Sequence, residues 1–158
     1  MMNVDKFTDI VARFLAMSGK ILPDDVTEKL SQLNAEESQP LAKTVYESMF
    51  ENQRLAAELD RPSCQDTGVI QFFIKAGADF PLLSEVRPIL DEAVRRATQE
   101  APLRHNAVEI FEEKNTGNNT GERIPWIDWE IIPNDSGILL DVYMAGGGCS
   151  LPGQGMTL

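Results

Sequence analysis

Cys64-Gln65-Asp66-Thr67-Gly68-Val69-Ile70-Gln71-Phe72-Phe73-Ile74 is the stretch that decides the fold. It begins with polar and small residues that predict a turn, because aspartate and glycine favour turn conformations. It ends with β-branched and aromatic residues, which are typical of a buried strand. Functional residues are commonly found where a polar turn leads into a rigid strand. The stretch therefore predicts both the start of a sheet and a candidate site.

The residues before this stretch are predicted to be helical. Apolar residues at helical spacing mark a helix that begins near Val4 and ends at Ser18-Gly19. A second helix opens at Pro23-Asp24-Asp25, and a third runs from an N-cap at Ser38 to about Leu59. We interpret all three as scaffold. The buried side of the third helix is expected at Leu41, Val45, Met49 and Leu55.

The residues after the strand contain one helix and two further strands. The range 84–101 is expected to be a helix, because its apolar residues repeat every four positions. Strands are expected at Trp126–Ile132 and at 138–144, where apolar residues alternate with others. The residues between these strands, Pro133-Asn134-Asp135-Ser136-Gly137, predict a hairpin that pairs them.

The sequence thus predicts an α+β fold with a helical part and a mixed part. Residues 1–60 form the helical layer, and residues 61–158 form a mixed α/β part with short strands. A length of 158 residues suits one domain. The last residues, 150–158, contain no closing helix or strand, so we expect a chain that is truncated at its C-terminus.

The net charge and the hydropathy pattern exclude several classes of partner. The chain has 14 basic and 25 acidic residues, a net charge of −11, and a pI near 4.5. Such a field repels a phosphate backbone, so we expect no nucleic-acid partner. No apolar run reaches the length of a membrane span, and the N-terminus lacks the apolar core of a signal peptide. We therefore expect a cytoplasmic protein without a membrane partner.

Three polar turns beside predicted strands are candidate sites, at 64–68, 115–121 and 146–149. A cysteine in a reducing compartment is by default a buried small apolar side chain, and in this turn the Cys64 thiol is open to three interpretations: a metal ligand, a nucleophile, or an ordinary turn residue. Gly146-Gly147-Gly148 allows backbone N–H groups to approach an anion. The segment lacks the Lys-Ser/Thr ending of a phosphate-binding loop, so we reject nucleotide binding.

The segment 102–106 is a fourth candidate, because it combines an arginine and a histidine after a predicted helix. Arg104 has the planar fork that binds a carboxylate, and the alternative interpretation is a solvated arginine at the surface. His105 is expected to be partly buried and hydrogen-bonded.

Four of these segments resemble one known family in their order and spacing. Residues 61–68, 101–108, 115–121 and 144–148 are similar to motifs of the iron–sulfur hydro-lyases, the family of class I fumarases and L(+)-tartrate dehydratase alpha subunits. The resemblance covers essentially the whole chain. The pattern Gly-Gly-Gly-Cys-Ser-Leu-Pro-Gly at 146–153 is more similar to the tartrate dehydratase branch than to the fumarases.

The resemblance implies a cofactor and a set of site residues. The cofactor is a [4Fe-4S] cluster held by three cysteines, whose open iron acts as a Lewis acid on a 2-hydroxy diacid. Cys64 corresponds to the first cluster ligand. Asp66 corresponds to a catalytic position. The substrate-binding positions correspond to Gln65, Arg104 and Gly147.

The resemblance also implies that this chain is one part of a larger site. Two further cluster cysteines are expected beyond Leu158, and Cys149 is not counted as a ligand because it takes the place of a fumarase serine. A beta subunit is expected to complete the site in an oligomer. We favour dehydration of L(+)-tartrate to oxaloacetate. The alternatives are a class I fumarase alpha subunit acting on fumarate and malate, and a non-catalytic truncated remnant or assembly module.

Overall fold

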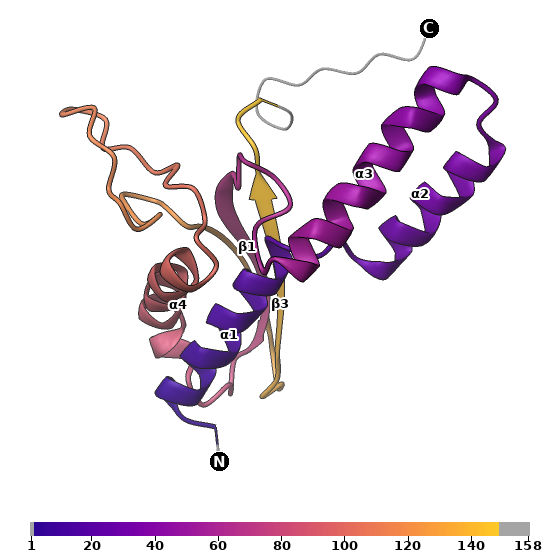
Figure 1. Cartoon of the computed structure of the whole chain (residues 1–158). Helices are drawn as coiled ribbons and strands as arrows, with labels where there is room; N and C mark the ends of the chain where they lie inside the picture. The colour runs from indigo at the N-terminus through magenta and orange to yellow at the C-terminus, as the bar shows by residue number, and fades with distance from the viewer. Residues whose placement is uncertain (1, 149–158) are drawn as a thin grey trace, which may run out of the picture.

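The computed structural model describes residues 2–148. Within this range the chain forms four α-helices and a three-stranded mixed sheet, which confirms the predicted α+β fold (Figure 1). A short 3₁₀ helix, Leu83–Glu85, leads into the last of the four helices. The elements in chain order are α1 (Val4–Ser18), α2 (Asp24–Glu36), α3 (Pro40–Glu58), β1 (Val69–Gly77), α4 (Val86–Glu100), β2 (Trp126–Ile132) and β3 (Ile138–Ala145).

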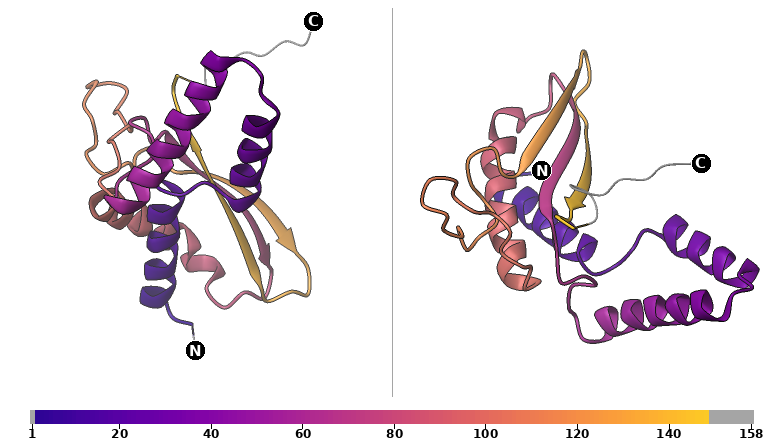
Figure 2. Two further views of the ribbon diagram at one scale, coloured as in Figure 1. Left: turned by 45° about the vertical axis from the view of Figure 1, so that its right-hand side comes forward. Right: turned by 90° about the horizontal axis from the view of Figure 1, so that it is seen from above.

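The sheet has the strand order β2-β1-β3, with β1 parallel to β2 and antiparallel to β3. Every second residue of β1 is buried, because successive side chains of a strand point to opposite faces. The buried face belongs to the core that α1 and α4 also build, and Figure 2 shows both helices on the same side of the sheet. Its members are Ile70, Phe72, Ile74 and Ala76.

The predicted hairpin between the last two strands is wrong, because β1 lies between them. The segment 133–137 instead crosses the end of β1, where the Gly77 N–H donates to the Gly137 carbonyl at 2.8 Å. A Cβ atom on Gly77 would lie 2.0 Å from the Asp135 carbonyl oxygen, so this close crossing requires glycine. The strand with the most buried residues thereby takes the central place, where it is paired along both edges.

Helices α1 and α4 pack against each other and against the sheet. The α1 helix begins at the predicted position, with the Asn3 side chain capping it by accepting from the Lys6 N–H at 2.9 Å. Its buried face contains Phe7, Val11 and Leu15, as the apolar spacing predicts. The predicted helix at 84–101 is also present, and its apolar repeat faces the core.

Helices α2 and α3 form an antiparallel pair that projects away from the sheet (Figures 1 and 2). The predicted burial of the apolar side of α3 is wrong, since Ala56 is its one buried residue. The four residues expected to be buried are exposed to between 37% and 79%: Leu41, Val45, Met49 and Leu55. The reason is that, among the described residues, α2 is the one helix or strand that packs against α3 to more than a slight extent.

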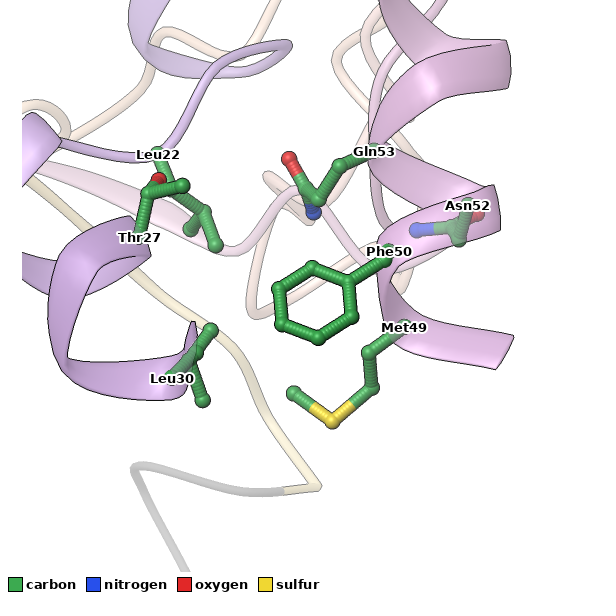
Figure 3. A pocket seen from close by; sticks show the side chains of 7 residues that line it. All are labelled: Leu22, Thr27, Leu30, Met49, Phe50, Asn52 and Gln53. Carbon is green, nitrogen blue, oxygen red and sulfur yellow. The ribbon is translucent and has the colours of Figure 1, made fainter. Parts of the chain in front are cut away.

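The start of α3 and the space between α2 and α3 show the same sparse packing. Gln39 is the N-cap residue in place of the predicted Ser38, and no side chain caps the helix. Figure 3 shows Leu30 of α2 directed toward Met49 and Phe50 of α3. These side chains line a cavity of about 150 Å³ between the two helices.

Across residues 2–148, no helix combines the length and the apolar character needed to span a bilayer.

Candidate functional site

The turns at 64–68 and 146–148 meet at one end of the sheet. The first turn precedes β1 and the second follows β3. Because these strands are antiparallel, with Val69 paired to Ala145, the start of one lies beside the end of the other. The fold therefore brings together two polar turns that are far apart in the sequence.

The Asp66 carboxylate joins the two turns directly. Its Oδ1 accepts from the Gly68 N–H at 3.0 Å, and its Oδ2 accepts from the Gly147 N–H at 2.8 Å. The Asn106 amide donates a third hydrogen bond to Oδ1 at 2.9 Å. The N–H groups of Gly68 and Gly147 hold the pKa of Asp66 below its usual value, because they stabilise the charged form. Asp66 is therefore ionised at neutral pH.

Gly68 allows the close approach of the two turns. Its φ of +77° lies in the left-handed region, which side chains disfavour. A Cβ atom at this position would lie 2.6 Å from the carbonyl carbon of Ala145. A Cβ atom on Gly147 would be only in ordinary contact with Asp66, at 3.6 Å from Oδ2. The strict requirement for glycine thus falls on Gly68, which the sequence reasoning did not select as a site residue.

Hydrogen bonds link the segment after α4 to the turn at 64–68. The Thr67 hydroxyl donates to the Arg104 carbonyl at 3.2 Å, and the Asn106 amide donates to the Gly68 carbonyl at 3.1 Å. These bonds place Arg104 at the same end of the sheet as Asp66. The Arg104 side chain is exposed, which agrees with both a substrate clamp and a solvated arginine.

Asn119 connects the asparagine-rich turn at 115–121 to Arg104 and Asn106. The residue is 3% exposed and has a φ of +56°, a conformation that asparagine tolerates better than most residues. Its Oδ1 accepts from the Asn106 N–H at 2.7 Å, and its amide donates to the Arg104 carbonyl at 2.9 Å. The same amide reaches the hydroxyl of Thr98 in α4 at 3.2 Å.

Asn106 and Asn119 were missed as site residues by the sequence reasoning. Both lie in segments that the motifs had singled out. For Asn119 the available signal was an asparagine between glycines in a turn, which indicates a left-handed conformation but not the partner of the side chain. Nothing comparable marks Asn106.

Two adjoining hollows contain all five predicted site residues. Arg104 lines both of them. One hollow is also lined by Cys64, Gln65 and Thr67. The other is also lined by Asp66, Gly68, Asn106 and Gly147. Three of the four motif segments thus line these hollows, and the fourth, 115–121, supports them from the interior through Asn119.

The environment of Cys64 narrows its interpretation. The thiol is free and exposed, so the interpretation of Cys64 as an ordinary buried residue is wrong. No group of three metal-ligating side chains occurs within residues 2–148, so Cys64 is not accompanied there by other ligands. Cys149 lies outside the described residues. His105 is exposed rather than partly buried, because its loop lies at the surface.

The sequence matches that of known proteins over most of its length. The chain is 54% identical to the L(+)-tartrate dehydratase subunit alpha of Escherichia coli (strain K12), over 98% of this chain and 51% of that protein. The same values hold for the subunit of the same name in Shigella sonnei. A putative L(+)-tartrate dehydratase subunit alpha of Methanocaldococcus jannaschii is 34% identical, over 79% of this chain and 45% of that protein.

The chain spans about half the length of the curated relatives it matches. The family described as Fumarate hydratase (Fumerase) matches residues 8–158, which include every element of the structure except the first turn of α1. The candidate site therefore lies entirely within the matched region, and the chain belongs to the fumarate hydratase (Fumerase) family.

Proposed function

We propose that this chain supplies the alpha-type half of an iron–sulfur hydro-lyase site that dehydrates L(+)-tartrate to oxaloacetate. The observation that carries the proposal is the convergence of Asp66, Arg104 and Gly147 on one hollow, with Cys64 and Gln65 lining the adjoining one. The identity to tartrate dehydratase alpha subunits supports tartrate over fumarate or malate as the substrate.

Arg104 is proposed to bind a substrate carboxylate. The chain has a net charge of −11, so a dicarboxylate needs a local positive charge to offset the overall repulsion. Arg104 lines both hollows and is exposed, so its guanidinium can provide that charge. A guanidinium fork can donate two parallel hydrogen bonds to a carboxylate, which fixes the orientation of the substrate as well as its position.

Asp66 and Gly147 are proposed to act as a pair. The Gly147 N–H already donates to Asp66, so this glycine contributes open space and a fixed carboxylate rather than a free donor. Asp66 is ionised, and an ionised carboxylate can accept a hydrogen bond from a substrate hydroxyl or accept a proton. The exposed Gln65 amide can donate to or accept from the second hydroxyl of a tartrate molecule.

Cys64 is proposed to supply one ligand of a [4Fe-4S] cluster. The Cys64 thiol is exposed and lines the hollow next to the one that contains Asp66, which suits this task because cluster ligands are thiolates. Residues 2–148 hold no other cysteine, so the remaining ligands come from outside this range. When bound, the cluster supplies a Lewis acid that assists the departure of hydroxide.

The surroundings of the site support further proposals about partners and location. A beta subunit is proposed to complete the site, in an oligomer, because the relatives are named as alpha subunits. A cytoplasmic location is proposed because an exposed free thiol stays reduced there. The alternative functions are a fumarase alpha subunit, supported by the family match, and a non-catalytic assembly module.

The test uses a complete enzyme, which here denotes this sequence joined to the second half of the E. coli relative and combined with a beta subunit. We expect dehydration of L(+)-tartrate with a higher kcat/KM than that of malate. Arg104→Ala should lower kcat/KM about ten- to a hundred-fold, and Arg104→Lys should recover only part of this loss, because lysine keeps the charge without the fork. Arg13→Ala is the control, since Arg13 lies exposed on α1.

Three outcomes would contradict the proposal. A preference for malate or fumarate would favour the fumarase alternative. No turnover with any dicarboxylate, despite a full iron content, would favour the assembly module. If both Arg104 variants matched the wild type within about two-fold, Arg104 would be a surface residue and not a clamp.

A further inference from the structure

We propose that Asn106 is a positioning residue that holds the Asp66 carboxylate in place, and that Asn119 in turn fixes Asn106. This inference rests on the proposed function, because it assigns Asn106 a role in the reaction through Asp66. Asn106 lines the hollow that contains Asp66, and Asn119 is buried behind it, but the sequence motifs assign neither residue a role.

Three hydrogen bonds hold the Asp66 carboxylate in place. Two of the hydrogen bonds to its carboxylate come from backbone N–H groups, those of Gly68 and Gly147. Among the residues that the structure describes, Asn106 provides the one side-chain hydrogen bond to this carboxylate. The same amide also donates to the Gly68 carbonyl, so Asn106 binds both ends of the short turn that carries Asp66.

Asn106 is itself held in place by the side chain of Asn119. Its backbone N–H donates to Asn119, and the carbonyl of Arg104, two residues earlier, accepts from the same Asn119 side chain. Asn119 is 3% exposed and also reaches Thr98, whose own hydroxyl donates to Val94 within α4 at 2.7 Å. A continuous series of hydrogen bonds therefore runs from the rigid helix α4 to Asp66.

The side chain at position 106 needs two N–H donors, and asparagine provides them. The primary amide of Asn106 has two N–H donors, and both have acceptors here, on Asp66 and on Gly68. Aspartate has nearly the same shape but offers no donor when it is ionised, so it would face the Asp66 carboxylate with a like charge. Alanine would leave both acceptors without this partner. Asn106→Asp, which removes the donors at constant side-chain size, can therefore be compared with Asn106→Ala, which removes the side chain.

The experiment is a double-mutant cycle in the complete enzyme, with iron content measured for every variant. Asn106→Ala should lower kcat/KM for L(+)-tartrate about ten- to a hundred-fold, as expected for the loss of a hydrogen bond to a charged group. In an Asp66→Ala background, the same change should lower it less than about three-fold, because the residue through which Asn106 acts is absent. The dissociation constant of succinate, a dicarboxylate without a hydroxyl group to eliminate, measured by calorimetry, gives a second readout of the same cycle.

The matched control is Asn115→Ala. Asn115 donates its amide to the His105 carbonyl, so this variant disturbs the same segment without removing a contact to Asp66. We expect its kcat/KM to stay within about two-fold of wild type. Asn106→Asp repeats the test at constant side-chain size, in case the alanine variant does not fold, and is expected to lose at least as much activity as Asn106→Ala.

The outcomes separate this inference from the proposed function. An active wild type with an Asn106→Ala variant within two-fold of it would overturn the inference alone. Losses that add in the double variant, or an equal loss in Asn115→Ala, would also overturn it, because they indicate a general structural role. A wild-type enzyme without hydro-lyase activity would overturn the proposed function and this inference with it.

Discussion

Helices α1 and α3 carry similar apolar stripes and lie in very different surroundings. Leu15 of α1 is fully buried against α4 and the sheet, whereas Leu41 of α3 is 79% exposed. The body formed by α1, α4 and the sheet contains the core cluster of the described residues, and the α2–α3 pair contributes none of it. The free energy of folding therefore comes mainly from the body, which is also the part that builds the candidate site.

The largest effect should come from truncating the same residue type in the two regions. Leu15→Ala should lower the free energy of unfolding by about 3–5 kcal/mol, because it leaves a cavity in a packed core. Leu41→Ala should change it by less than about 0.5 kcal/mol, because its side chain already contacts water. Urea unfolding of residues 1–158 measures both variants. Equal losses would show that α3 is packed as tightly as α1.

A pair of glycines sharpens the same contrast between packed and open positions. Gly68 and Gly117 have nearly the same φ, +77° and +76°, so alanine costs about 1–2 kcal/mol at either site from backbone strain alone. A Cβ atom on Gly68 would collide with Ala145, while one on Gly117 would meet nothing within 4 Å.

Gly68→Ala should therefore lower the free energy of unfolding by about 3 kcal/mol, and Gly117→Ala by about 1 kcal/mol. Thermal unfolding of both variants under identical conditions gives the difference. A Gly117 variant at least as unstable as the Gly68 variant would rule out close packing of the two site turns as the cause.

Some residues of the body are expected to contribute little to the free energy of unfolding, and Glu92 of α4 is one of them. Hydrogen bonds from Arg96 and Arg95 hold the pKa of Glu92 below its usual value, on the outer side of α4. A lowered pKa stabilises the fold above the unfolded-state pKa of about 4.3, and this contribution is lost as the pH falls. The side chains are about 40% exposed, so solvent screens the pairs.

Glu92→Gln should accordingly cost about 0.5 kcal/mol at pH 7, and the difference from wild type should shrink as the pH falls below about 4.3 and vanish below the lowered pKa of the folded state. Unfolding free energies measured across this pH range provide the check. A loss above about 2 kcal/mol would mean that this ion pair behaves as a buried one.

The sequence was sufficient to predict the individual elements of the fold. Apolar spacing located α1 and α4, and the alternation of β2 and β3 located those strands, because local periodicity reflects which face is buried. The same reasoning paired β2 with β3 wrongly, since the order of strands depends on long-range contacts with β1. It also placed Leu41 in a core, because periodicity identifies an apolar face but not the element that covers it.

The candidate site was predicted in its members but not in its internal contacts. The motif segments identified Cys64, Asp66, Arg104 and Gly147, and the antiparallel pairing of β1 with β3 explains why the turns at 64–68 and 146–148 meet. No local pattern predicts that Asn119 reaches across to Asn106, since that contact depends on the path of the whole segment between α4 and β2. The roles proposed for the site residues stay predictions until they are measured.

The most direct test of the account is the iron content of the complete enzyme after Cys64→Ser. We expect this variant to lose cluster iron and L(+)-tartrate dehydration together, because serine does not replace a thiolate ligand well. Cys149→Ser is the matched control and should retain most of the iron. If wild type and Cys64→Ser bind equal iron after anaerobic reconstitution, Cys64 is not a ligand and the proposed site is wrong.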